Sequence, residues 1–328
     1  MAENIYAKIK KDLPGIENSI FLKEYTTFKI GGPAKYFFVA KNKEDLIKAI
    51  EVSKKFKLPI FILGGGSNVL VSDKGFNGLV VKLQILGIEI NKNKIYVGAG
   101  VMLPKLVSVF LKNNFSGFEW ASGVPGTIGG AVYGNAQAFG TKTSDAVDSV
   151  EVLDIKTLKF KNFSKEQCKF SLKNSLFKKS TLRASDKKFV ITSIVLKLEK
   201  GDEKEIKERI HNFIKYRKNN HPTTFHSAGS VFVNPELVIK NKKLLKKYPE
   251  LEKFVENGVI PSAYLIEKSG LKGKKIGGAQ ISEKHANFII NLGNAKTKDV
   301  LALINLAKKK VKENFNINLE TEVQRIGL

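Results

Sequence analysis

Two glycine-rich segments are the parts of this sequence best suited to holding a ligand by its backbone. The first follows an apolar run and consists of Gly64, Gly65, Gly66, Ser67 and Asn68. Glycines let successive N–H groups turn toward one anion and let the chain approach it closely. This segment fits either a pyrophosphate cradle or a tight turn. It is neither a Rossmann fingerprint, which needs a following helix, nor a P-loop, which needs Gly-Lys-Ser/Thr.

The second segment, residues 122–136, interleaves glycines with apolar residues. That pattern suits a backbone that lies flat against a planar ligand while it closes a core. We expect Thr127, Asn135 and exposed N–H groups to bond ring heteroatoms. Two independent glycine-rich loops in one domain favour a ligand over a purely structural explanation. The candidate residues are Ser122, Gly123, Pro125, Gly126, Thr127, Gly129, Gly130 and Asn135.

The elements that must position these loops follow from hydrophobic periodicity. Residues 36–40 and 60–63 read as strands and residues 44–56 between them as an amphipathic helix, which makes a βαβ unit. The first glycine segment leaves this unit and enters a further strand at 69–71. We predict more strands at 79–83, 94–97, 150–155 and 189–198, a helix at 103–113, and an ordered loop over 122–140.

The second half of the chain begins with a charge-dense stretch, residues 200–209, that opens a helix running to about Lys218. Such a stretch is a plausible domain boundary. The last helix, from Thr297 to about Asn314, places its apolar residues on one face and most of its lysines on the other, which we interpret as a solvated face. An α+β region is therefore expected after residue 200.

Composition limits the function classes. The 328 residues suffice for two or three domains, and nothing approaches the roughly 18 apolar residues of a spanning helix. The start of the chain lacks a secretory apolar block, so we expect a cytoplasmic protein. Cys168 is the single cysteine, and the four histidines lack metal-ligand spacing, so no metal is expected. The net charge of +25 comes from scattered lysines, which favours a solvated surface over nucleic-acid binding.

Five segments of the sequence resemble motifs of the enolpyruvyl-UDP-N-acetylglucosamine reductase family and occur in the same order as in that family. The short overall plan and the Ser-Ala-Gly-Ser run are similar to the family's second type. The resemblance covers nearly the whole chain. The matching segments are residues 27–34 (TFKIGGPA), 64–68 (GGGSN), 123–131 (GVPGTIGGA), 227–235 (SAGSVFVNP) and 319–323 (LETEV).

This resemblance implies an α+β fold with a two-part FAD-binding domain of the vanillyl-alcohol-oxidase (PCMH) type and a smaller α+β substrate-binding domain. It implies noncovalent FAD, NADPH as reductant, and UDP-N-acetylglucosamine enolpyruvate as substrate, with no nucleic-acid or membrane partner. We expect a monomer. The expected domains are an N-terminal helical segment (1–19), the FAD domain (20–200), the substrate domain (201–318) and a C-terminal strand that carries a catalytic Glu (319–328).

The resemblance also assigns catalytic roles. Ser230 matches the family's proton donor and Glu322 its acid near the same carbon, although on residue type alone a turn serine and a strand-end acid would be expected. The family's catalytic arginine position holds Lys173, which keeps the charge but loses the planar fork that grips a carboxylate. Either Lys173 suffices, or Lys178 or Arg183 contributes.

The residues expected to contact the substrate depart from the family's usual pattern at two positions. Val233 and Asn220 stand where the family often has lysine, so we assign substrate binding to Asn234 and diphosphate contacts to Lys272. Two rival functions stay open at this point. One is another flavoprotein of the same FAD fold, such as a sugar or lactone oxidase, and the other is a basic nucleic-acid-binding protein.

Overall fold

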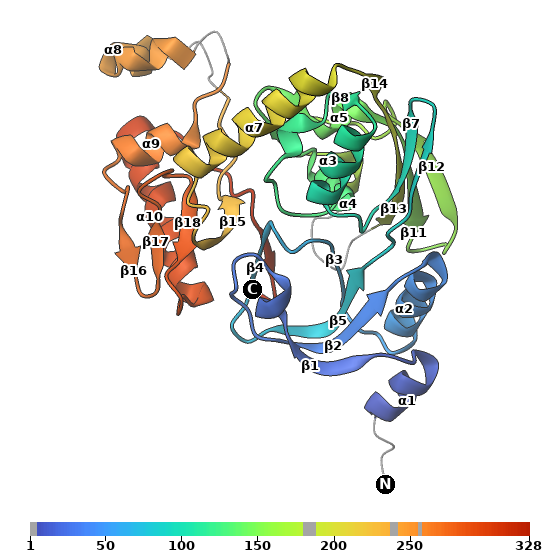
Figure 1. The fold of residues 1–328 in the computed structure, drawn as a ribbon. Coiled ribbons are helices and arrows are strands. Elements are labelled where there is room, and N and C mark those ends of the chain that lie inside the picture. The colour runs from blue at the N-terminus through green and yellow to red at the C-terminus, as the bar shows by residue number, and fades with distance from the viewer. Residues whose placement is uncertain (1–4, 180–187, 237–241, 255–257) are drawn as a thin grey trace.

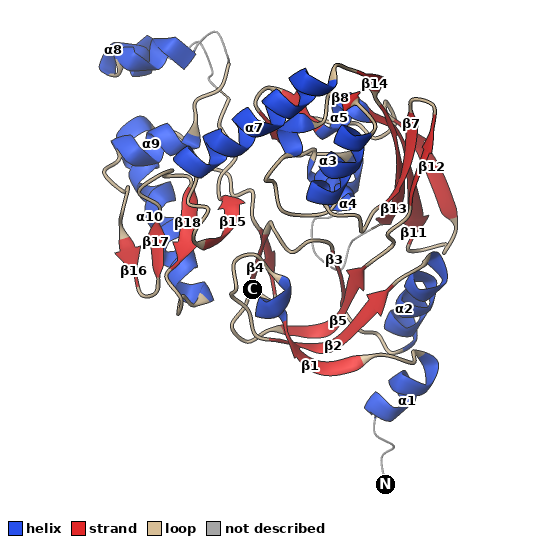
Figure 2. Ribbon diagram, in the orientation of Figure 1, coloured by secondary structure: helices blue, strands red, loops and turns tan. Residues whose placement is uncertain are grey.

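The computed structural model describes residues 5–179, 188–236, 242–254 and 258–328. Its elements form three groups, two from the N-terminal part of the chain and one from the C-terminal part (Figures 1 and 2). The predicted Arg183 lies outside the described residues. Within these ranges no helix is both long and apolar enough to cross a membrane.

The first group is a four-stranded sheet of order β1-β2-β5-β3. Strands β2 and β3 both run parallel to β5, which lies between them, so the predicted βαβ unit is confirmed. Helix α2 begins at Asn42, whose side chain accepts a hydrogen bond from the Asp45 N–H at 2.7 Å. The elements are α1 (Ile5–Asp12), β1 (Glu17–Phe21), the 3₁₀ helix η1 (Leu22–Tyr25), β2 (Pro33–Ala40), α2 (Lys43–Lys55), β3 (Ile60–Leu63) and β5 (Phe76–Leu83).

The second group is a five-stranded antiparallel sheet of order β12-β11-β13-β7-β6, with helices α3 and α4 beside it (Figure 1). Its strands are β6 (Ile88–Asn91), β7 (Lys94–Gly98), β11 (Val147–Asp154), β12 (Phe160–Ser164) and β13 (Phe189–Lys197). Short elements around it are α3 (Leu103–Lys112), β8 (Phe115–Ser116), η2 (Glu119–Ala121), α4 (Ile128–Gly134), β9 (Gln137–Ala138), β10 (Thr141–Lys142), α5 (Thr143–Ala146), α6 (Leu176–Lys179) and β14 (Glu199–Lys200).

Helix α4 corrects the expectation of a loop over residues 122–140. Three of its seven residues are glycines, which are poor helix formers, so the sequence does not predict a helix here. The helix forms because both ends are capped and because Ile128, Ala131 and Val132 are buried in the core. Tertiary packing here overrides local propensity.

The third group is a sheet of order β15-β18-β17-β16 covered by α10, whose buried Val300, Leu303 and Ile304 confirm the predicted apolar face. Helix α7 runs from the second group to the third (Figure 1). The elements are α7 (Glu203–Asn220), β15 (His226–Ser230), α8 (Lys242–Lys247), η4 (Pro249–Phe254), α9 (Ser262–Lys268), β16 (Lys275–Ile276), β17 (Ala279–Ile281), β18 (Phe288–Asn291) and α10 (Thr297–Phe315).

The end of the chain returns to the first glycine-rich segment. Strand β19 (Gln324–Ile326) pairs in parallel with β4 (Val69–Val71), the strand that this segment enters. Two parallel strands begin at the same end of their sheet, so the residues that precede β4 lie beside those that precede β19. The Asn68 side chain accordingly donates to the Glu322 carbonyl at 3.3 Å.

Candidate active site

The two glycine-rich segments lie directly against each other. A Cβ added to Gly65 would lie 2.4 Å from the Cα of Gly126, and a Cβ on Gly126 would lie 2.6 Å from the Ser67 Oγ. Both distances are shorter than van der Waals contact, and at Gly65 the obstructing atom is backbone, so a side chain there would push the segments apart. The two loops therefore form one backbone-walled surface, as a ligand shared by both would require.

Two cations that sequence analysis missed support these loops. Lys82, in β5, donates to the carbonyl of Gly64, and burial lowers the pKa of its ammonium group. Arg217, in α7, donates from Nε to the Ser122 carbonyl at 2.9 Å and from its guanidinium to the Trp120 carbonyl at 3.0 Å. Burial also lowers the pKa of Arg217. A lysine between Val81 and Leu83 in a mostly apolar strand was a usable sequence signal, whereas Arg217 sits in a lysine-rich helix and gave none.

The polar side chains of the second loop are partly engaged within the protein. The Thr127 Oγ1 caps α4 by accepting from the Gly130 N–H at 3.3 Å. Asn135 ends the helix in the left-handed conformation and is 1% exposed. Its amide donates to the Ser171 carbonyl at 3.0 Å and accepts from the Ser144 N–H at 3.1 Å. Asn135 thus links the glycine-rich loop to the segment that carries Lys173.

Two buried polar groups at the start of this loop lack hydrogen-bond partners among the described residues. The Ser122 Oγ and the Trp120 Nε1 are buried and, among the described residues, have no hydrogen-bond partner. Buried polar groups are normally paired, so such atoms call for a ligand or ordered water. With the side-chain-free wall of the glycines, they fit a dinucleotide that needs both close backbone approach and hydrogen-bond partners.

Lys173 and Glu322 form an ion pair, although they lie far apart in the sequence. The Lys173 Nζ is 3.2 Å from the Glu322 Oε1, and the side chains are 21% and 15% exposed. The other carboxylate oxygen of Glu322 is buried and finds no partner among the described residues. This carboxylate therefore has one paired oxygen and one oxygen that can still accept a hydrogen bond.

The backbone brings Ser230 next to this pair. The Glu322 N–H donates to the carbonyl of Val231, the residue after Ser230, at 2.8 Å. Strand β15 bulges between Ser227 and Ser230, and Gly229 adopts a φ of +77°. A bulge changes the direction of a side chain near a strand end. The residue after Ser230 therefore bonds the backbone of Glu322, and the Glu322 side chain pairs with Lys173.

The two residues assigned to the substrate lie farther out in the third group. The Asn234 Oδ1 accepts from the Ser262 N–H at 3.0 Å, close to the start of α9. Lys272 pairs with Glu267 at 3.2 Å, and both side chains are exposed at 37% and 53%. A substrate that recruits Lys272 must displace a surface ion pair worth about 0–1 kcal/mol, which is a small cost.

Two histidines lie close together at the C-terminal end of α7, where His221 directly follows the helix. His221 and His285 are 5.3 Å apart by ring centroid, and His221 also contacts the ring of Phe288, which pairs with Ser230. Burial, with smaller contributions from His285 and Arg217, lowers the pKa of His221 to about 4. Burial also lowers the pKa of His285. In both residues burial therefore favours the neutral imidazole.

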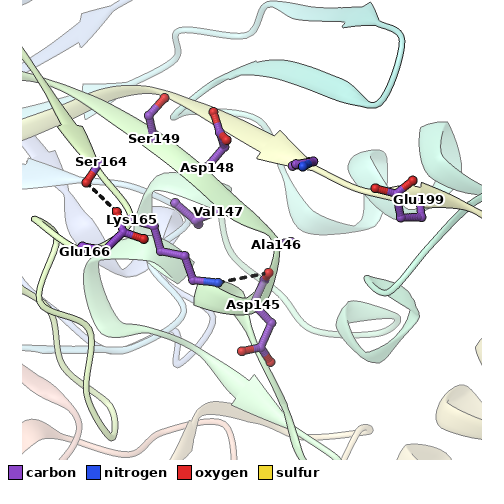
Figure 3. Close-up of a pocket in the computed structure, with 10 residues that line it drawn as sticks. Asp145, Ala146, Val147, Asp148, Ser149, Ser164, Lys165, Glu166 and Glu199 are labelled. Carbon is purple, nitrogen blue, oxygen red and sulfur yellow. Dashed lines mark hydrogen bonds between the residues drawn. The ribbon is translucent and has the colours of Figure 1, made fainter.

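A separate surface hollow of about 520 Å³ lies on the five-stranded sheet, lined from β11, β12 and β13 (Figure 3). In it the Lys165 ammonium reaches the Asp145 carbonyl at 3.5 Å, and the Ser164 hydroxyl donates to Glu166 at 2.7 Å. Its charged groups are exposed and of both signs. None of the sequence-predicted site residues lines it, so the candidate active site is elsewhere.

Comparison with known proteins gives consistent matches over the two parts of the chain. Residues 34–157 match the family model described as FAD binding domain, and residues 221–326 match the C-terminal domain of UDP-N-acetylenolpyruvoylglucosamine reductase. The UDP-N-acetylenolpyruvoylglucosamine reductase of Caldanaerobacter subterraneus is 38% identical over 100% of this chain and 99% of its own length.

Two further relatives agree with this match. The Clostridium novyi reductase of the same name is 38% identical over 96% of this chain and 94% of its own length. The crystal structure of UDP-N-acetylenolpyruvylglucosamine reductase from Thermus caldophilus superposes with a TM-score of 0.73 at 31% identity, covering 95% of this chain and 98% of that one. This chain belongs to the UDP-N-acetylenolpyruvoylglucosamine reductase family.

Proposed function

We propose that this protein reduces the enolpyruvyl ether of UDP-N-acetylglucosamine to UDP-N-acetylmuramate, a precursor of peptidoglycan, with FAD as cofactor and NADPH as electron source. The observation that carries the proposal is the Lys173–Glu322 ion pair beside Ser230 and the first glycine-rich loop. Full-length relatives at 38% identity favour this reductase over an oxidase of the same fold. They also disfavour a nucleic-acid-binding protein. We place the reaction in the cytoplasm.

The two glycine-rich loops would hold FAD noncovalently. The candidate backbone contacts are Gly64 to Asn68 and Ser122 to Gly130, and the free Ser122 hydroxyl offers one side-chain contact. When bound and reduced, FAD supplies the hydride that adds to the terminal carbon of the enolpyruvyl group. Lys82 and Arg217 keep the loops closed around it through their carbonyl contacts.

Hydride addition leaves negative charge on the carbon next to the substrate carboxylate. Lys173 neutralises this charge, because its ammonium group is partly buried and its position is fixed by Glu322. Ser230 then donates a proton to that carbon. Among the described residues no group hydrogen bonds the Ser230 hydroxyl, which leaves it available to the substrate. Asn234 and Lys272 bind the nucleotide portion.

The visible spectrum of the purified protein tests the proposal directly. We expect a yellow protein that NADPH bleaches under anaerobic conditions and that enolpyruvyl-UDP-N-acetylglucosamine restores. Restoration by oxygen alone, with no response to the sugar nucleotide, would favour the oxidase. A colourless preparation that takes up no added FAD would exclude both flavoprotein functions.

A further inference from the structure

The loop that carries Lys173 is a strained turn. Residues Ser171 and Asn174 exchange two backbone hydrogen bonds, at 3.1 and 3.2 Å, across Leu172 and Lys173. Lys173 has a φ of +51°, in the left-handed region. For a residue with a side chain this conformation costs free energy, and it persists only where surrounding contacts enforce it.

Three contacts enforce this turn. At its base, Asn135 donates to the Ser171 carbonyl at 3.0 Å, and the Ser175 hydroxyl donates to the Tyr133 carbonyl at 2.7 Å. At its tip, the Lys178 ammonium donates to the carbonyl of Lys173 at 2.8 Å. The base contacts hold the turn to α4, whereas the tip contact acts on the strained residue itself.

Lys178 is an unusual residue for such a contact. It lies in the short helix α6, is partly buried, and has a pKa lowered by that burial and by the positive charge of Lys173, while Glu322 acts in the opposite direction. A buried ammonium group costs free energy unless its contacts compensate. Among the described residues the compensation is one bond to the Lys173 carbonyl and the proximity of Glu322, so stability alone explains Lys178 poorly.

We propose that Lys178 is a positioning residue, which clamps the backbone of Lys173 so that the Lys173 ammonium group stays beside Glu322 and the substrate carboxylate. It acts through Lys173 and does not touch the substrate. This inference depends on the role of Lys173 given under the proposed function. It also explains how a lysine can replace an arginine, because a single-point cation lacks the geometric fork of guanidinium and needs a fixed backbone instead.

The test replaces Lys178 with Met, with Lys179→Met as the matched control because Lys179 is the exposed neighbour in the same helix. Hydrogen exchange measured by mass spectrometry on a peptide covering residues 168–178 should be faster in Lys178→Met and unchanged in the control. This measurement needs no flavin and no substrate. Global unfolding in urea identifies any variant that has simply lost stability.

Catalysis is measured as two half-reactions under anaerobic conditions. Lys178→Met should slow flavin reoxidation by the sugar nucleotide about 10- to 100-fold, the usual effect of a misplaced catalytic group, and leave flavin reduction by NADPH unchanged. Lys178→Arg, which keeps charge and donor, should restore most of the rate. In a Lys173→Ala background, Lys178→Met should have little further effect, because the two residues act in series.

Several results would overturn this inference. Unchanged exchange and reoxidation in Lys178→Met would do so, as would equal slowing of both half-reactions. Full additivity of Lys178→Met with Lys173→Ala would assign Lys178 a direct role instead. Failure of the proposed function would look different, since the wild-type protein itself would then not be reoxidised by the sugar nucleotide.

Discussion

The contact between the two glycine-rich loops predicts that Gly65→Ala harms both folding and flavin binding. The new Cβ would lie 2.4 Å from the Gly126 Cα, and ordinary contact begins at 3.4 Å, so the loops must separate by 3.4 − 2.4 = about 1 Å. Because the obstructing atom is backbone, no side-chain rotation relieves the clash. Overpacking of this kind costs about 1–3 kcal/mol.

The free energy cost of Gly65→Ala should appear partly as lower folding stability and partly as weaker flavin binding. If the loops stay closed, urea unfolding of the flavin-free protein shows the whole loss. If they open, flavin that requires the closed form binds about 5- to 150-fold more weakly for the same 1–3 kcal/mol. Unfolding and a fluorescence titration with FAD measure the two contributions, and their sum should fall in this range.

Two other glycines serve as controls. Gly134→Ala adds a methyl group that meets no atom of the described residues within 4 Å, so it should change neither quantity appreciably. Gly130→Ala meets only the Thr127 Oγ1 at 3.5 Å, so it should fold normally, and a selective loss of flavin affinity would identify Gly130 as a cofactor contact. The reasoning is refuted if Gly65→Ala matches the wild type in both unfolding free energy and flavin affinity.

Three further predictions follow from the site. Ser230→Ala should slow flavin reoxidation by substrate about 10²–10³-fold and spare reduction by NADPH, measured by stopped-flow absorbance; equal slowing of both steps would make Ser230 structural. Lys173→Ala should slow the same step severely and Lys173→Arg should preserve it, whereas an unchanged rate in Lys173→Ala would remove Lys173 from the mechanism. The pKa of His221, about 4 when folded and 6.5 ordinarily, means that the unfolded chain binds the extra proton as the pH falls. The full shift would be about 3 kcal/mol, and after a discount for solvent screening about 1–2 kcal/mol of stability present above pH 6.5 should be lost toward pH 4. His221→Gln should reduce that loss in urea unfolding at pH 7 and 4.5, and an identical pH dependence would contradict the assignment.

Periodicity predicted the regular elements well where packing and local preference agree. Helices α2 and α10 each present one apolar face, and β3 and β4 are short apolar runs beside glycines, so their positions were readable from the sequence. Helix α4 was missed because its glycines argue against a helix and only its burial stabilises it. Local signals cannot report a contact that forms elsewhere in the chain.

The same limit applies to the site. The glycine-rich loops were identified from composition, but their mutual contact depends on the approach of Gly65 to Gly126, which no spacing rule predicts. The roles of Ser230, Glu322 and Lys173 came from family resemblance and stay predictions, although the structure pairs Lys173 with Glu322 and bonds the Glu322 backbone to the residue after Ser230. Lys82 stands out as a lysine between apolar residues, but the contact of Arg217 with the distant Ser122 carbonyl leaves no trace in the lysine-rich sequence around it.

The pairing of β19 with β4 has a consequence for synthesis. Asn68 and Glu322 are 254 positions apart, so β4 leaves the ribosome long before the strand that completes it. Until then the apolar residues Val69, Leu70 and Val71 lack their strand partner, and such an edge is open to pairing with other chains. Domains fold from the N-terminus during synthesis, whereas Glu322, the carboxylate to which we propose a catalytic role, directly precedes β19 and is made long after β4. If Glu322 has that role, a nascent chain gains the activity only once the segment that leads into β19 has been made.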